Sequence, residues 1–141
     1  MTALIAKLRR RSSVELAMLA AALTMRVCAL VLLRVASFGT LQKWAASAAR
    51  ACSRHATGDT NCDRVVAWAV ATAAVVLPVE NSCLHDALAA QWLLTACGRP
   101  STIRFGVSRN GVHALRAHAW VESNGGVIVG DANARAVDVL E

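Results

Sequence analysis

The sequence of 141 residues is poor in proline, with only 2, and it contains no low-complexity tract. Hydrophobic residues make up 56% of the chain, so this composition excludes a disordered protein and favours a single domain with a substantial core. No CxxC pair occurs, and the 5 cysteines match neither a common zinc pattern nor a disulfide framework. The sequence therefore predicts no structural metal and no disulfide, and this use of cysteine is typical of the cytoplasm.

The chain also lacks an uninterrupted apolar run long enough to cross a membrane. The basic cluster KLRRR, at residues 7–11, precedes an apolar stretch that resembles a signal or anchor segment. However, Arg26 lies near the middle of that stretch, and the apolar run Val27–Leu33 is far shorter than the roughly 20 residues of a span. We expect an amphipathic helix over about 12–37 that packs on protein, and we expect no membrane contact.

Basic residues outnumber acidic ones by 15 to 9, which gives a formal net charge of +6. Such a balance raises the question of nucleic-acid binding. The chain has no recognisable nucleic-acid motif and no aromatic series between its basic residues, so we expect no nucleic-acid partner. A basic surface that attracts an acidic peptide, and one that serves only solubility, both stay open.

The hydrophobic periodicity changes along the chain, with helical patterns in the first two-thirds and β patterns in the last third. These patterns predict an α+β fold in which N-terminal helices precede a helix carrying a cysteine and then an antiparallel sheet. We expect a single domain, with residues 1–58 as a helical segment packed on a core formed by residues 59–141. The helices expected before the cysteine-bearing one cover about 12–37, 41–51 and 60–77.

Cys83 lies at the start of the last expected helix. Ser82 before it is a good N-cap, and Gly98 and Pro100 suit the end of this helix. A thiol in the first helical turn meets the positive end of the helix dipole and unpaired backbone N–H groups, which favour the thiolate. The same N–H groups can hold an oxyanion. Cys83 is therefore the candidate nucleophile, and the other cysteines are interpreted as small core or surface residues: Cys28, Cys52, Cys62 and Cys97.

The stretch RAHAWVESNGGVIVGD, residues 116–131, predicts a β-hairpin around Asn124-Gly125, a dipeptide that favours a two-residue type I′ turn. The pairs expected from this turn are Glu122 with Val127, Trp120 with Val129 and His118 with Asp131. Opposed residues point to the same side of a sheet with Cβ atoms about 4.5–5.5 Å apart. A histidine oriented by a carboxylate can serve as a general base, so Cys83, His118 and Asp131 form the candidate catalytic triad.

Several segments resemble a known family. The order of cysteine on a helix, then histidine and aspartate on neighbouring strands, is that of papain-like and transglutaminase-like folds. The chain is similar to the transglutaminase-like cysteine peptidases of lasso peptide biosynthesis, the stand-alone leader peptidases of the B-protein type. The resemblance covers about residues 60–131 and depends on RVVAWAVATAAVVLP, SCLHDALAAQWLLTACGRPSTIRFGV, RAHAWVE and VIVGD.

This resemblance assigns the nucleophile to Cys83, the general base to His118 and the residue that orients it to Asp131. It implies cleavage of a ribosomally made precursor between leader and core, without a cofactor or metal. The partners implied are the precursor peptide, a separate precursor-recognition protein of the RiPP recognition element type, and a macrolactam cyclase similar to asparagine synthetase. Acyl transfer to an amine, as in a transglutaminase, and a non-catalytic adaptor role stay open as alternatives.

Two details of the presumed site are left open by the sequence. His85 and Asp86 in the first helical turn are a departure from the family pattern, and their role is undefined. Asn81 and Ser82 are candidates to complete an oxyanion hole, although backbone N–H groups alone would suffice.

Overall fold

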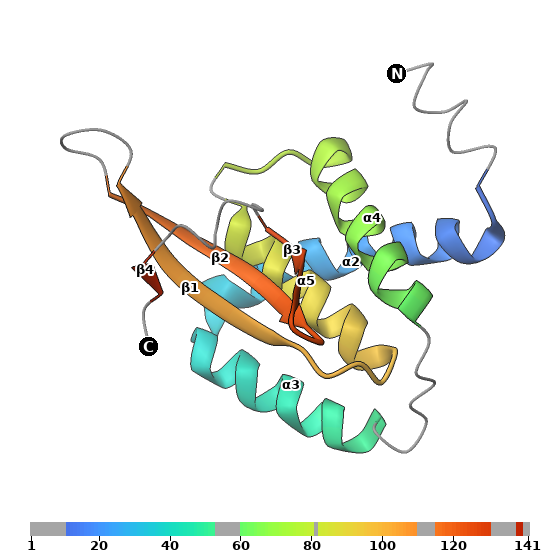
Figure 1. The fold of residues 1–141 in the computed structure, drawn as a ribbon, viewed down its shortest axis with the longest axis horizontal. Helices are drawn as coiled ribbons and strands as arrows, with labels where there is room; N and C mark the ends of the chain where they lie inside the picture. The colour runs from blue at the N-terminus through green and yellow to red at the C-terminus, as the bar shows by residue number, and fades with distance from the viewer. Residues whose placement is uncertain (1–10, 53–59, 81, 110–114, 131–137, 140–141) are drawn as a thin grey trace.

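The computed structural model describes residues 11–52, 60–80, 82–109, 115–130 and 138–139, and it shows helices followed by a sheet (Figure 1). The elements are α2 (Ser13–Val35), α3 (Phe38–Cys52), α4 (Thr60–Val76), α5 (Cys83–Ala96), β1 (Thr102–Arg109), β2 (Leu115–Ser123), β3 (Gly126–Val129) and β4 (Asp138–Val139). The strands are ordered β3-β2-β1-β4, and each neighbouring pair is antiparallel. The α+β class predicted from the sequence is confirmed.

The first described helix, α2, begins with a capping box. The Ser12 hydroxyl accepts a hydrogen bond from the backbone N–H of Glu15, and the Glu15 carboxylate accepts one from the backbone N–H of Ser12. The helix α2 is long and apolar enough to cross a membrane, but core helices of soluble proteins meet the same criteria of length and composition. In this structure α2 packs against α4 and α5, and Arg26 at its middle is completely buried.

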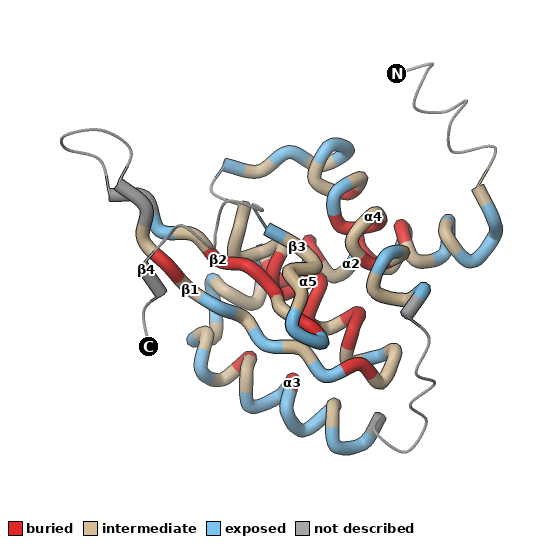
Figure 2. The backbone as a smooth tube through the Cα atoms, viewed as in Figure 1, coloured by how far each residue is buried: buried red, intermediate tan, exposed pale blue. Residues whose placement is uncertain are grey.

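The central element is α5, which contacts α2, α3, α4 and the sheet. A helix that is apolar on all sides requires such a surrounding, and most of α5 beyond its first turn is buried (Figure 2). Gly98 ends the helix with a φ of 70°, a conformation that favours glycine. Leu19 and Ala22 of α2 join the core cluster that surrounds α5. The proposed division of the chain at residue 58 stays a prediction.

The sheet has one face on the helices and one face away from them. Ile103 and Phe105 of β1 pair with Val121 and Ala119 of β2, and all four side chains belong to or pack against the core cluster around α5. Because side chains alternate along a strand, the intervening residues project from the opposite face. On that face Arg104 forms an ion pair with Glu122 at 3.5 Å.

The β2–β3 hairpin confirms the predicted turn and corrects the predicted register. Asn124 and Gly125 have φ values of 51° and 76°, as a type I′ turn requires, and Glu122 pairs with Val127 as expected. The pairing then shifts, so that Val129 lies opposite Val121 and not opposite Trp120. A β-bulge at this point adds one residue to β3 and removes the basis on which His118 was paired with Asp131.

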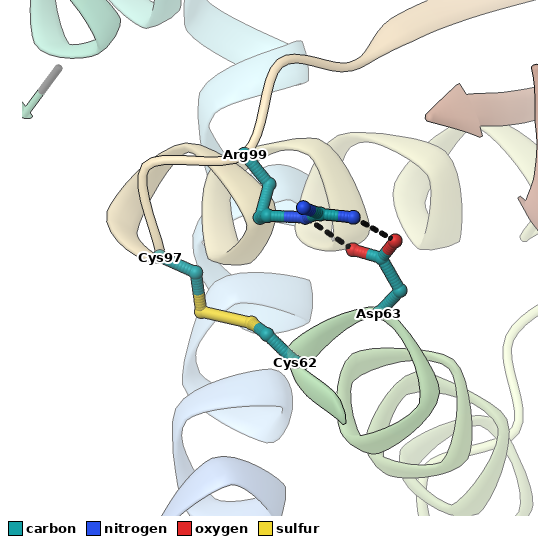
Figure 3. Close-up of a disulfide and its surroundings, with 4 residues drawn as sticks. All are labelled: Cys62, Asp63, Cys97 and Arg99. Atoms are coloured by element: carbon teal, nitrogen blue, oxygen red, sulfur yellow. Dashed lines mark hydrogen bonds and ion pairs between the residues drawn. A yellow bond between two sulfur atoms is a disulfide. The ribbon is translucent and has the colours of Figure 1, made fainter. Parts of the chain in front are cut away.

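A disulfide between Cys62 and Cys97 corrects the prediction that these residues are unlinked packing residues. Beside it, the Arg99 guanidinium donates two hydrogen bonds to the Asp63 carboxylate, at 2.9 and 2.6 Å. Figure 3 shows the two links together, joining the start of α4 to the chain that leaves α5. Disulfides are rare in a reducing cytosol. The disulfide therefore removes the argument for a cytoplasmic location that was based on the cysteine pattern. The cytoplasmic location stays a prediction.

Breaking this disulfide is expected to destabilise the fold. A Cys97→Ser variant should lose about 3–4 kcal/mol in free energy of unfolding, because the sequence separation of 35 makes the closed loop large. Urea denaturation with and without a reductant measures the effect. The reductant should lower the midpoint of the wild-type protein and leave that of Cys97→Ser unchanged. Equal wild-type midpoints in both conditions would contradict the disulfide.

Candidate active site

Cys83 is placed where the sequence predicted it, as the first residue of α5. Its side chain is partly buried and packs against the core cluster that also contains Ala119 and Val121 of β2. Cys83 is a free thiol in this structure. The start of α5 gives this thiol the positive end of a helix dipole and the N–H groups of a first helical turn, which have no acceptor within the helix.

Ser82 precedes the thiol but does not cap the helix with its side chain. Its backbone is helical, with φ −75° and ψ −5°, and its hydroxyl makes no hydrogen bond to a backbone N–H of α5. The hydroxyl instead donates to Oδ2 of Asp86 at 2.9 Å, while the backbone N–H of Asp86 donates to the Ser82 carbonyl at 2.8 Å. The first-turn N–H groups beside Cys83 are therefore left without a side-chain cap from Ser82.

Asp86 also forms an ion pair across to α2. Its Oδ1 lies 2.8 Å from Nε of Arg26, and the two side chains are 16% and 1% exposed. Burial raises the pKa of the Asp86 carboxyl, and this effect is opposed by the Ser82 hydrogen bond and by the charges of Arg26 and His85. Among the described residues, Nε, Nη1 and Nη2 of Arg26 and Oδ1 of Asp86 have no hydrogen-bond partner, so the 2.8 Å contact is an ion pair without hydrogen-bond geometry. The sequence analysis did not identify this pair.

His85 lies next to the same ion pair. Its Nδ1 is buried and has no hydrogen-bond partner within the part of the chain that the structure describes. Burial lowers the pKa of the imidazole and Arg26 lowers it further, whereas the Asp86 charge acts in the opposite direction. His85 therefore binds a proton less readily than a free histidine does, and its role stays undefined.

His118 lies in β2, opposite Gly106 of β1. Its neighbour Ala119 packs on the helices, so the alternation of the strand puts His118 on the other face, together with Trp120. Trp120 is 2% exposed and donates from Nε1 to Oε1 of Glu122 at 2.9 Å. Within the described ranges no hydrogen bond joins His118 to Cys83. The structure thus packs β2 against α5, but it does not bring the His118 imidazole into contact with the Cys83 thiol.

Asp131 lies outside the described residues, as does Asn81, so their predicted roles stay predictions. The last described residue of this segment is Gly130, whose φ is 125°. A Cβ at this position would collide with Cβ of Trp120, so the close approach of the chain to β2 requires glycine here. In the described ranges no three His, Cys, Asp or Glu side chains group as metal ligands.

Comparison with known proteins places this arrangement in a family. The family model of the transglutaminase-like superfamily matches residues 22–141, which is most of the chain. The protein therefore belongs to the transglutaminase-like superfamily, whose fold generally carries cysteine peptidase or acyl transferase activity. Searches of characterised proteins and of solved structures found no significant match.

Proposed function

We propose that this protein is a cysteine peptidase that removes the leader from a ribosomally synthesised lasso peptide precursor. The observation that carries the proposal is Cys83, a free thiol at the start of a central helix in a transglutaminase-like chain. The resemblance of residues 60–131 to the stand-alone leader peptidases supports the choice of substrate. The superfamily alone supports the coarser statement, cysteine-dependent acyl chemistry.

In the proposed reaction the Cys83 thiolate attacks the carbonyl at the end of the leader. The tetrahedral oxyanion is held by backbone N–H groups of the first turn of α5. Protonated His118 gives its proton to the departing amine of the core peptide, and the acyl group stays on the sulfur as a thioester. Water, deprotonated by His118, then releases the leader acid. Asp131 is proposed to orient His118 in these steps.

The imidazole has to reach the thiol for these steps to occur. In the structure His118 and Cys83 are not hydrogen bonded, and His118 projects from the face of β2 opposite to that of Ala119 and Val121, which belong to the core cluster that Cys83 packs against. The proposal therefore requires β2 to twist or to shift its register on binding the precursor, so that His118 turns toward the start of α5. The Trp120–Glu122 hydrogen bond and the close approach of Gly130 are the contacts that such a change would alter.

Mass spectrometry of a lasso precursor incubated with the protein, its recognition protein and the cyclase tests the proposed function. A leader acid and a shorter core peptide should appear with the wild-type protein and be missing with Cys83→Ala. Added primary amine distinguishes the transglutaminase alternative, because that activity would give an amide of the leader in place of the acid. Product formation with Cys83→Ala would favour the non-catalytic adaptor.

We further propose that the protein acts in the cytoplasm with two partners. The freed N-terminus of the core is the substrate of a cyclase similar to asparagine synthetase, and a separate recognition protein presents the leader. The helices α2 and α3 are proposed as the docking surface for a partner. They carry several exposed apolar side chains: Val14, Leu16, Val27, Val31, Val35 and Trp44.

The recognition protein is expected to accelerate cleavage about tenfold or more, because presentation of the leader raises the effective concentration of substrate at the site. A time course with the purified protein and full-length precursor, with and without the recognition protein, measures this effect. A precursor without its leader-binding motif is the control and should be cut equally slowly in both arms. Equal rates with the intact precursor would show that this chain binds the leader itself.

A further inference from the structure

The first turn of α5 contains an unusual use of a capping residue. A serine at a helix start normally accepts a hydrogen bond from a backbone N–H two or three residues on. Ser12 does this in α2, where its backbone is extended and Oγ accepts from the N–H of Glu15 at 3.3 Å. Ser82 has the same position relative to α5, yet its hydroxyl is bound to the Asp86 carboxylate.

The Asp86 carboxylate that accepts from this hydroxyl is also held from its other side by the attraction of a buried cation. Oδ1 lies 2.8 Å from Nε of Arg26, and Oδ2 accepts the hydrogen bond from Ser82. Arg26 is fully buried in α2, so its guanidinium cannot move to solvent without disrupting the core. A chain of contacts therefore runs from the middle of α2 to the residue that precedes Cys83.

We propose that Asp86 and Arg26 are positioning residues that hold the Ser82 hydroxyl away from the first-turn N–H groups of α5. These N–H groups then stay available to the negative charge on the Cys83 sulfur and on the oxyanion formed by its attack. This inference rests on the proposed role of Cys83 as the nucleophile. Without the Asp86 acceptor, the Ser82 backbone would be released from its helical conformation to the extended one that an N-cap requires, and its hydroxyl would then accept from an N–H group that the reaction uses.

Stability alone does not account for this pair. A buried ion pair carries a large desolvation cost, and an apolar pair of similar volume is often as stable or more stable. The cost is high here because Nε, Nη1 and Nη2 of Arg26 are all buried without a hydrogen-bond partner among the described residues. The pair is explained if its function is to control Ser82 beside the thiol.

The test compares proteins that differ only in the Ser82 hydroxyl. The first comparison is wild type with Ser82→Ala, and the second is Arg26→Met/Asp86→Ala with the same variant carrying Ser82→Ala. In the first comparison, Ser82→Ala should not raise kcat for precursor cleavage. The variant Arg26→Met/Asp86→Ala should have a kcat about tenfold or more below that of wild type. In the second comparison, adding Ser82→Ala to this variant should restore most of the lost kcat.

The rescue should appear in kcat and not in KM, because the N–H groups stabilise charge that develops in the reaction. A merely structural role of the pair predicts no rescue, since removing a hydroxyl does not rebuild the core. Equal kcat values in the second comparison would therefore overturn the proposal. Arg26→Leu/Asp86→Leu provides the same comparison if the first pair of substitutions does not fold.

Alkylation of Cys83 by iodoacetamide, located by peptide mapping, separates this inference from the proposed function. It reports the thiolate without any peptide substrate. In the background lacking the ion pair, Ser82→Ala should raise the alkylation rate several-fold, and both proteins compared carry the same charges. A raised rate together with no cleavage of any precursor would reject the peptidase and keep the positioning role. Unchanged alkylation would reject the positioning role.

Discussion

Replacing Cys83 with alanine is expected to lower kcat/KM for precursor cleavage by roughly 10⁴- to 10⁶-fold, the scale seen when a hydrolase loses its nucleophile. No other side chain can take over, because the helix start positions the sulfur beside the N–H groups of the first turn. The fold should persist, since Cys83 is only partly buried. Initial rates of leader release, with thermal unfolding of each protein, measure both parts of the prediction.

Cys28→Ser is the matched control. Cys28 is also a free and partly buried thiol, but it lies in the interior of α2 and not at its start. Its replacement should leave kcat/KM within about threefold of wild type, because mid-helix N–H groups are already bonded to carbonyls. If activity survives Cys83→Ala and falls with Cys28→Ser, the nucleophile is Cys28 and its assignment to α5 is wrong.

Breaking the Arg26–Asp86 ion pair from one side is expected to have the largest effect on stability. Asp86→Ala leaves the completely buried Arg26 cation without its partner, and such a loss typically costs about 3–5 kcal/mol of unfolding free energy. Arg26→Met leaves the Asp86 carboxylate, which is only 16% exposed, in the same unpaired condition. Urea denaturation of the two single variants measures both costs.

The double variant Arg26→Met/Asp86→Ala completes this comparison. With both charges removed, no ion is left buried, so the double variant should be more stable than either single variant. Arg104→Met, which breaks the exposed pair Arg104–Glu122, is the control, because exposed ion pairs contribute only about 0–1 kcal/mol. Additive losses in the double variant would mean that Arg26 and Asp86 stabilise the fold through separate contacts.

Local signals in the sequence were sufficient to predict the position of the helix that carries Cys83 and of the hairpin turn. Gly98 ends α5 and Asn124-Gly125 specifies the turn, because each of these depends on neighbours within a few residues. Ser82 precedes α5 as predicted, but the expected side-chain cap is wrong, because its hydroxyl donates to Asp86. The register beyond Val127 was predicted wrongly. A bulge depends on how β3 packs on the core, and the residues GVIV carry no local signal for it.

Long-range contacts were not accessible from the sequence alone. Cys62 and Cys97 are 35 residues apart, and only the packing of α4 on α5 shows that their side chains meet. Arg26 and Asp86 were each visible as a charge in an apolar helix, but their pairing required the crossing of α2 and α5. Buried charges in apolar segments were the signal that could have predicted this contact.

The Cys62–Cys97 disulfide and the free Cys83 thiol place opposite redox demands on one chain. Reductants keep a nucleophilic thiol from being oxidised to sulfenic acid or a mixed disulfide. The same reductants attack the bond that joins the start of α4 to the end of α5. Cys83 lies between these two cysteines in the sequence, within the loop that the disulfide closes. The protein should therefore work best over a limited range of thiol–disulfide potential, bounded below by reduction of the disulfide and above by oxidation of Cys83.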